Sequence, residues 1–489
     1  MHSTLPRYRF SWLHLAACLA TLAAAGAQAG NSVDGSAGDS TAIARIESGL
    51  RPVVALADVP VAPLALVDEM KRLNVPGVSV AVIKDGKVAW ARGYGVAWTG
   101  GPAITPQTLF QAASISKPVT AMAALRMVEQ DKFDLDAGID KALTGWTLPK
   151  GDGIPSVRQL LSHTGGMSVS GFPGYAAGKP VPTLQQVLDG AGPANTRAIR
   201  VDAAPGSAFR YSGGGYTLLQ QAMTDRAGQP FDAIMRELVL SPLAMTDSTF
   251  AQPLLPELAP KAARPHDRNG KAFPGGAFTH PEQAAAGLWT TPQDLARFAI
   301  AVQQGAAGQA GGVLTPAMTR TMLQPVKNSY ALGLAIEDGG KAFGHNGSNQ
   351  GFKTVMHASI ADGNGAVILT NGDNGMEVAA ALMRAIAYEY QWAGTQTKLR
   401  KAVALAPETR RSLAGSYKLE GLPDFEIAER DGQLMVNQRA GQWEPLYAES
   451  DKVLFVLSRD LELRRHDADS GQVVLGTSAR SYARVTDTY

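Results

Sequence analysis

The hydrophobic pattern changes its period along the chain, and this change constrains the fold more than any other feature. Apolar and polar residues alternate on both sides of Asp85-Gly86, which predicts a β-hairpin over 77–96. From Ser114 to about Gln130 the apolar residues take a helical spacing. Between about 135 and 280, helical stretches and loops rich in glycine and proline replace the strand-like pattern.

Strand-like patterns return after this helical region. They lie at 330–336, 353–359 and 366–370. Helices are predicted at 231–240, at 291–303 and at about 377–390. Strands from both ends should pair in one antiparallel sheet, flanked by helices, with a mostly helical insertion between them. We therefore expect an α/β fold of the α+β kind, over residues 62–395.

The chain after Lys398 has a different hydrophobic pattern. Its segments are short and alternating, as in Gln433–Asn437, Val453–Leu457 and Leu461–Arg465. The pairs Asp431-Gly432 and Ser470-Gly471 are typical of turns. Residues 408–489 are thus predicted to form a small C-terminal all-β domain, with a barrel as one possible form, and 396–407 a linker.

The N-terminus is typical of a signal peptide over residues 1–29. Arg7 and Arg9 precede a mostly apolar stretch, and Ala27-Gln28-Ala29 has the small residues that precede cleavage. The alternatives are a membrane anchor, for which the apolar run is shorter than the roughly 20 residues needed, and lipidation at Cys18. Cleavage near Ala29 predicts a periplasmic or secreted protein without a membrane span, and residues 30–61 form an irregular N-terminal extension.

Composition excludes several functions. The 489 residues hold 45 Lys and Arg against 43 Asp and Glu, so nothing favours nucleic acid as a partner. The sequence has no phosphate-binding glycine loop and no H-E-x-x-H motif, and its 8 histidines are scattered. We expect no cofactor and no metal, and a small molecule or a peptide as substrate. The oligomeric state stays open.

Ser114 and Lys117 carry the first chemical signal. A serine three residues before a lysine lies on the same helical face, so the two side chains can meet. A serine hydroxyl becomes a good nucleophile only when a base takes its proton. The start of a helix also offers a backbone N–H to a developing oxyanion. The pair alone is common in a chain of this length, and a solvated helix start is the plain alternative.

Three further motifs follow in order: Leu160–Gly166 (LLSHTGG), Tyr211–Tyr216 (YSGGGY) and Gly344–Asn349 (GHNGSN). With the S-x-x-K pair, they resemble the serine β-lactamase and penicillin-binding-protein superfamily. The resemblance covers roughly residues 62–395 and is nearest to the class C β-lactamase-like branch, which includes esterases, D-aminopeptidases and DD-peptidases.

The resemblance implies a role for each motif residue. Ser114 would be the nucleophile and Lys117 the general base or proton relay. Tyr211 would exchange protons with the nucleophile and the leaving group; the alternative for it is a core aromatic. His345 and Gly347 would anchor the strand motif that is usually Lys-Thr-Gly.

The same resemblance implies the groups that hold the substrate. The backbone N–H groups of Ser114 and Ser348 would form the oxyanion hole. Gly213, Asn346 and Gly347 would line the substrate site.

Two positions depart from the family pattern. Gly213 stands where the second motif usually has asparagine, which removes a side chain that would bind a substrate amide. His345 replaces lysine, and an imidazole with an ordinary pKa near roughly 6.5 is mostly neutral at neutral pH. We expect it to become positive, and to bind substrate anions better, as the pH falls from about 8 to about 6. Both changes disfavour an efficient β-lactamase.

His163 offers another reading, as the base of a Ser-His-Asp triad. The form of Ser162–Gly166 instead predicts a structural turn after a short helix. The sequence has no G-x-S-x-G elbow to support an α/β-hydrolase.

Together these residues predict a serine hydrolase that acts through an acyl-serine intermediate on an ester or a peptide-like amide. One alternative is a DD-peptidase or β-lactamase acting on cell-wall peptides or β-lactams. An alternative of another class is a non-catalytic receptor related to penicillin-binding proteins, with the C-terminal domain as its interaction module.

Overall fold

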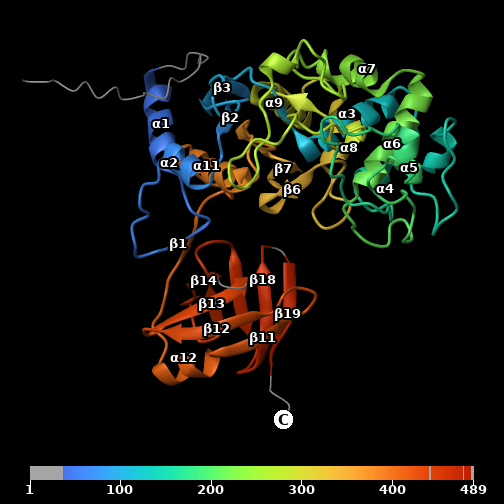
Figure 1. The fold of residues 1–489 in the computed structure, drawn as a ribbon. Helices are drawn as coiled ribbons and strands as arrows, with labels where there is room; N and C mark the ends of the chain where they lie inside the picture. Colours follow the sequence, from blue (N-terminus) through green and yellow to red (C-terminus); the bar gives the residue numbers. More distant parts are fainter. Residues whose placement is uncertain (1–36, 440–441, 477, 486–489) are drawn as a thin grey trace, which may run out of the picture.

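The computed structural model describes residues 37–439, 442–476 and 478–485, arranged as a large mixed α/β unit above a smaller all-β unit (Figure 1). The predicted signal peptide, the cleavage site near Ala29 and Cys18 lie outside the described residues. Within the described ranges, no helix has both the length and the apolar character needed to cross a membrane.

The large unit is built on an antiparallel sheet of six strands. Their order is β3 (Lys87–Gly95), β2 (Gly77–Lys84), β9 (Gly365–Thr370), β8 (Phe352–Ser359), β7 (Ala342–Asn349) and β6 (Ala335–Glu337). Two of the strands come from the start of the unit and four from its end, as the hydrophobic pattern predicts. The Asp85-Gly86 turn is confirmed, with φ of 51° and 70°.

The two faces of the sheet belong to different hydrophobic clusters. On β2, Val78, Val80 and Val82 join one cluster, whereas Ala81 and Ile83 join the other, because successive side chains point to opposite faces. The first cluster is covered by α1 (Ala37–Ser48), α2 (Leu66–Arg72) and α11 (Gly375–Glu389). The second is covered by α3 (Ser116–Glu129) and α9 (Pro292–Ala306), with the insertion beyond them.

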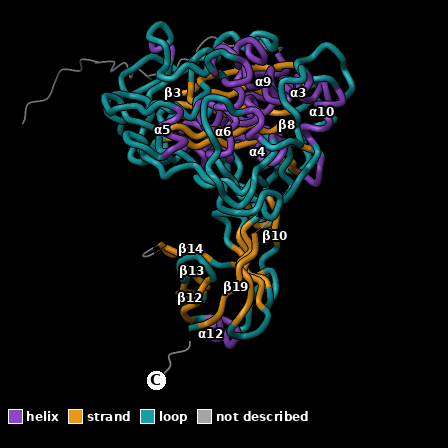
Figure 2. The backbone as a smooth tube through the Cα atoms, turned by 90° about the vertical axis from the view of Figure 1, so that its right-hand side faces the viewer, coloured by secondary structure: helices purple, strands orange, loops and turns teal. Residues whose placement is uncertain are grey.

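The regular elements of the insertion between β3 and β6 are mostly helices, as predicted, and long loops join them (Figure 2). Besides α3 and α9 it contains α4 (Val157–Leu161), α5 (Leu184–Asp189), α6 (Gly213–Ala227), α7 (Phe231–Met235), α8 (Gln283–Ala286) and α10 (Pro316–Leu323). It also holds the short strands β4 (Phe110–Gln111) and β5 (Trp289–Thr290), which pair with each other, and the 3-10 turns η1 (Ala113–Ile115), η2 (Ile139–Ala142) and η4 (Ala259–Lys261). The predicted helix at 231–240 divides into α7 and a π-helical turn, η3 (Arg236–Leu240). The turn η5 (Asp338–Gly340) joins β6 to β7.

Both ends of the large unit hold more regular structure than the pattern predicts. The N-terminal extension is not irregular, because α1 buries Ile43 and Ile46 against α11. The short strand β1 (Val54–Leu56) pairs in parallel with β10 (Lys398–Arg400), which lies in the predicted linker. Packing against distant residues orders both segments, and their own sequence gives no strong periodic signal.

The C-terminal unit is all-β, as predicted, with the short helix α12 (Pro407–Leu413) at its start. Its nine strands are β11 (Gly415–Leu419), β12 (Phe425–Arg430), β13 (Gln433–Arg439), β14 (Gln442–Pro445), β15 (Tyr447–Ala448), β16 (Val453–Phe455), β17 (Leu461–Arg465), β18 (Ser470–Leu475) and β19 (Ser478–Arg484). The sheet starts at β14 and ends at β15, which only Leu446 separates along the chain, so the sheet is nearly closed. The turn expected at Ser470-Gly471 falls earlier, since both residues begin β18.

Candidate active site

Ser114 lies in a tight turn directly before α3. The chain leaves β4, passes through η1 and enters the helix at Ser116. Ala113 has a φ of 51°, a left-handed conformation that is unfavourable for alanine. The Ser116 hydroxyl donates to Ala113 O at 2.6 Å and accepts from Leu288 N–H at 3.0 Å, which holds the turn in this shape. Ser114 itself is partly exposed, so its hydroxyl is accessible from outside.

Lys117 meets Ser114 as the spacing predicts. Its Nζ donates to Ser114 Oγ at 2.9 Å and to Ala285 O of α8 at 2.8 Å. The lysine is 2% exposed, and its hydrogen bond to Ala285 is buried, whereas the one to Ser114 is partly buried. Ala285 contributes a backbone carbonyl, which leaves no mark in a sequence, and sequence reasoning missed it.

Tyr211 comes to the same place from the segment before α6. Lys117 Nζ is 5.0 Å from the centroid of the Tyr211 ring. Ser212 caps α6 by accepting from Gly215 N–H at 3.1 Å, which fixes where the helix begins and therefore where Tyr211 stands. Tyr211 is partly exposed and lies close to Lys117.

The ring of His163 packs against the ring of Tyr211. It follows α4 with a φ of 57°, and its ring centroid lies 4.2 Å from that of Tyr211. Its Nδ1 accepts from Ser212 N–H at 3.1 Å. Burial, and then the charge of Lys117, lower the pKa of His163 well below its ordinary value. A buried, neutral imidazole with this contact positions the Tyr211 segment, in agreement with the structural turn expected there.

His345 of β7 is a neutral imidazole, and both of its ring nitrogens are hydrogen-bonded. Its Nδ1 is 2.7 Å from Asn346 O and its Nε2 is 3.0 Å from the Tyr330 hydroxyl. The carbonyl can only accept, so Nδ1 carries the proton and Nε2 accepts from Tyr330. Burial, and then the charge of Lys117, lower the pKa of His345 to about 3.

The expectation that His345 becomes positive between about pH 8 and about pH 6 is therefore wrong. An unperturbed pKa does not hold for a side chain that is 7% exposed beside a lysine. With both ring nitrogens hydrogen-bonded inside the protein, His345 has none left for a substrate anion. Tyr330, its partner, is a residue that sequence reasoning missed.

Gly347 allows β7 to lie against the turn that carries Ser114. A Cβ at this position would overlap Ala112 O and the Thr354 hydroxyl, which already hydrogen-bond to each other at 2.9 Å. Only glycine fits such a close backbone approach. The strand β6 pairs with 342–344 only, so β7 runs past it toward η1. Asn346 and Ser348 are exposed on this part of β7, next to the Ser114 turn.

Gly213, the first residue of α6, has an aromatic neighbour. A Cβ on Gly213 would stand 2.9 Å from Phe172 Cε2, and the Gly213 N–H donates to Ser170 O at 3.0 Å. The space where a side chain would begin is thus occupied by the Phe172 ring. Sequence reasoning missed Phe172, which lies in a loop without a recognisable motif.

The described residues contain no group of three or more His, Cys, Asp or Glu side chains arranged to hold a metal ion. The polar groups gathered at the site are Ser114, Lys117, Tyr211 and the exposed residues of β7. Such a set can supply a nucleophile, a proton acceptor and backbone N–H donors.

Comparison with known sequences gives two informative relatives. Penicillin-binding protein 4 of Amycolatopsis lactamdurans is 26% identical over 376 residues, which make up 71% of this chain and 94% of that protein. Protein flp of Staphylococcus aureus strain N315 is 24% identical over 322 residues, 62% of this chain and 61% of flp.

Solved structures share the fold. An octameric penicillin-binding protein homologue from Pyrococcus abyssi superposes with a TM-score of 0.57 at 20% identity, covering 85% of this chain and 98% of that one. D-amino acid amidase from Ochrobactrum anthropi SV3 superposes with a TM-score of 0.53 at 21% identity, covering 67% and 97%. Residues 65–391 match the family described as Beta-lactamase, and this match spans most of the chain. The protein therefore belongs to the β-lactamase family, within the superfamily of serine β-lactamases and penicillin-binding proteins.

Proposed function

We propose that this protein is a serine hydrolase that cleaves an ester or a peptide-like amide through an acyl-serine intermediate. The observation that carries the proposal is the 2.9 Å contact between Lys117 Nζ and the partly exposed Ser114 hydroxyl. Membership of the β-lactamase family supports the same chemistry. The amidase among its structural neighbours is compatible with a peptide-like amide.

In the first half of the reaction, Ser114 Oγ attacks the substrate carbonyl and forms a C–O bond. Lys117, in its neutral amine form, takes the Ser114 proton directly or through Tyr211 and becomes an ammonium. The backbone N–H groups of Ser114 and Ser348 hold the developing oxyanion. The tetrahedral intermediate then collapses, and the bond to the leaving group breaks. The leaving group takes the proton from Tyr211 or Lys117.

In the second half, water attacks the acyl-serine and gives up a proton along the same path. The C–O bond to Ser114 breaks, the acid product forms and the serine recovers its proton. No cofactor or metal is needed for either half.

The runner-up activity, a DD-peptidase or β-lactamase, is less well supported. Substrates of that kind carry a carboxylate, and the neutral His345 offers it no charge. Gly213 likewise offers no side chain to a substrate amide. The other alternative, a non-catalytic receptor, would not need Lys117 to be held against Ser114 by α8.

A fluorescent fluorophosphonate tests the proposal. The full chain should be labelled at Ser114. Ser114→Ala should lose both labelling and ester turnover while keeping its fold, since it removes one hydrogen bond, to Lys117, worth about 1–2 kcal/mol. The exposed Ser241→Ala is the matched control and should behave as wild type. Labelling of wild type elsewhere, or turnover retained in Ser114→Ala, would contradict the proposal.

We also propose export to the periplasm or the medium, on the strength of the N-terminal 29 residues. Sequencing the N-terminus of the mature protein tests this: an intact Met1 would contradict it.

A further inference from the structure

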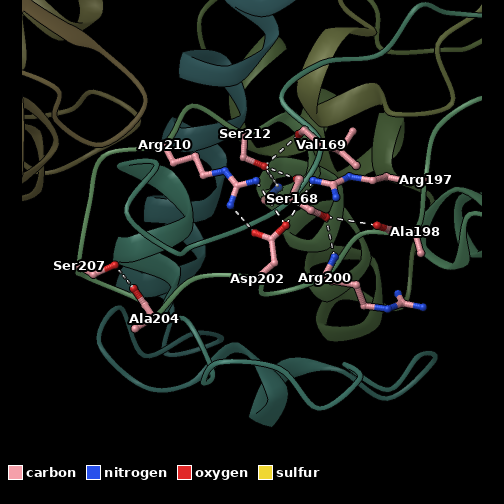
Figure 3. A network of polar contacts seen from close by, with 11 residues as sticks. Ser168, Val169, Arg197, Ala198, Arg200, Asp202, Ala204, Ser207, Arg210 and Ser212 are labelled. Carbon is pink, nitrogen blue, oxygen red and sulfur yellow. Dashed lines mark hydrogen bonds and ion pairs between the residues drawn. The ribbon is translucent and has the colours of Figure 1, made fainter. Parts of the chain in front are cut away.

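The loop 168–175 runs beside the site and is fixed at both ends. At its start, the Ser212 hydroxyl donates to Ser168 O at 2.8 Å (Figure 3). The Ser168 hydroxyl in turn accepts from Arg200 N–H at 2.8 Å. At its end, Tyr175 and Thr279 exchange backbone hydrogen bonds of 2.9 and 2.8 Å. The loop therefore spans from the segment that carries Tyr211 to the segment that leads into α8.

Phe172 lies in the middle of this loop. Its ring is partly buried and packs against the large hydrophobic cluster. Its edge approaches Gly213 so closely that a Cβ there would be 2.9 Å from Cε2 and 3.2 Å from Cδ2. Gly213 is only two residues from Tyr211. A phenyl ring thus lies beside the start of α6, two residues after Tyr211.

Two backbone N–H groups beside the ring are already satisfied. Gly213 N–H donates to Ser170 O, and Gly214 N–H donates to Val169 O, each at 3.0 Å. These contacts leave a substrate with apolar surface and few hydrogen-bond partners beside Gly213. An amide placed there would lose its hydrogen bonds to water without replacement, whereas a hydrocarbon chain would gain contact with the ring.

We propose that Phe172 sets the substrate specificity of the site, and that the preferred substrates carry a hydrocarbon acyl group rather than one with an amide beside the scissile carbonyl. This inference rests on the proposed acyl-serine chemistry and goes further by naming the acyl class. Phe172 takes no part in the chemical steps.

Two p-nitrophenyl esters of equal chain length test it: the pentanoate and the N-acetylglycine ester. They share the leaving group and the five-atom acyl chain, and differ in the amide. Wild type should favour the pentanoate in kcat/KM by roughly tenfold or more. Active sites are counted by titration with the fluorophosphonate, so an inactive or unfolded fraction does not affect the ratio.

Variants then assign the preference to the ring. Phe172→Ala should reduce the preference to within about threefold of unity, chiefly through a loss on the pentanoate. Phe172→Leu keeps an apolar wall and should retain most of the preference. The double variant Phe172→Ala/Gly213→Asn provides room for a side-chain amide and should favour the N-acetylglycine ester. Tyr388→Ala, which truncates an exposed aromatic on α11, is the control and should leave the ratio unchanged.

The outcomes distinguish a failure of the proposed hydrolase function from a failure of the role proposed for Phe172. Absence of acylation by either ester in wild type would contradict the proposed function itself. Acylation by both esters with a ratio near unity in wild type would overturn the role of Phe172, whether or not the variants fold. The role of Phe172 would also be overturned if Phe172→Ala left the ratio of the two kcat/KM values unchanged.

Discussion

The buried carboxylate of Glu282 gives a quantitative prediction of how the stability of the protein depends on pH. Glu282 is 0% exposed and stands at the start of α8, where its backbone carbonyl accepts from the N–H groups of Ala285 and Ala286 at 3.0 Å. Its two carboxylate oxygens have no hydrogen-bond partner among the described residues. Burial raises the pKa of Glu282 to about 7 from an ordinary 4.5.

The sign of the effect follows from proton binding. Between the two pKa values the folded protein keeps a proton that the unfolded chain has lost, so stability falls as the pH rises from 4.5 to about 7. Above pH 7, the difference between the folded and unfolded pKa values of Glu282 lowers the free energy of unfolding by about 3 kcal/mol. Glu282→Gln resembles the protonated acid at every pH. It should therefore stabilise the protein by up to that amount at about pH 8, and by little at about pH 4.5.

Thermal unfolding followed by circular dichroism measures the effect. For a unit of this size, about 3 kcal/mol raises Tm by roughly 4 °C. The exposed Glu237→Gln is the control and should change Tm by less than about 1 °C at either pH. A gain of equal size at both pH values, or no gain at the higher one, would refute the claim that this carboxylate is buried without a partner.

Three further predictions concern β7 and its contacts. The ring of His345 should show no titration between about pH 8 and about pH 5 in NMR spectra, since its pKa is about 3, and a midpoint near the ordinary value would contradict its burial. Tyr330→Phe, which removes the hydroxyl donor to this ring, should lower stability by about 1–2 kcal/mol in chemical unfolding, and an unchanged stability would show that the hydrogen bond is not formed. Gly347→Ala should slow acylation of Ser114 by roughly a hundredfold because its Cβ overlaps Ala112 O, whereas Gly312→Ala, with its nearest neighbour at 3.6 Å, should react at the wild-type rate.

The sequence predicts best what depends on local pattern. Alternation around Asp85-Gly86 places the hairpin, and the spacing of Ser114 and Lys117 places both side chains on one helical face. The short strands β13 and β17 of the C-terminal unit are likewise visible as alternating segments. In each case the partners lie within a few residues of one another, so the geometry of one element is enough.

What the sequence does not predict depends on distant segments. Ala285 reaches Lys117 across 168 residues, and it does so through a backbone carbonyl. Phe172 meets Gly213 only because a loop is tied down at both ends. The pKa of His345 is set by burial in the finished fold, so its residue type alone gave the wrong charge.

Burial first, and the charge of Lys117 second, keep several imidazoles near the site neutral. In that order, burial and this charge lower the pKa of His163, of His280 and of His345; for His280 the pKa falls to about 4. A second positive charge close to a buried ammonium is unfavourable because little water is present to screen it. His163 and His345 therefore add hydrogen bonds but no charge. The ring nitrogens of His280 have no hydrogen-bond partner among the described residues, so this ring adds only buried aromatic surface. A substrate anion would therefore find no cationic imidazole there, and the hydrocarbon acyl group proposed from Phe172 needs none. A loss of activity on moderate acidification would have to come from groups other than these three rings.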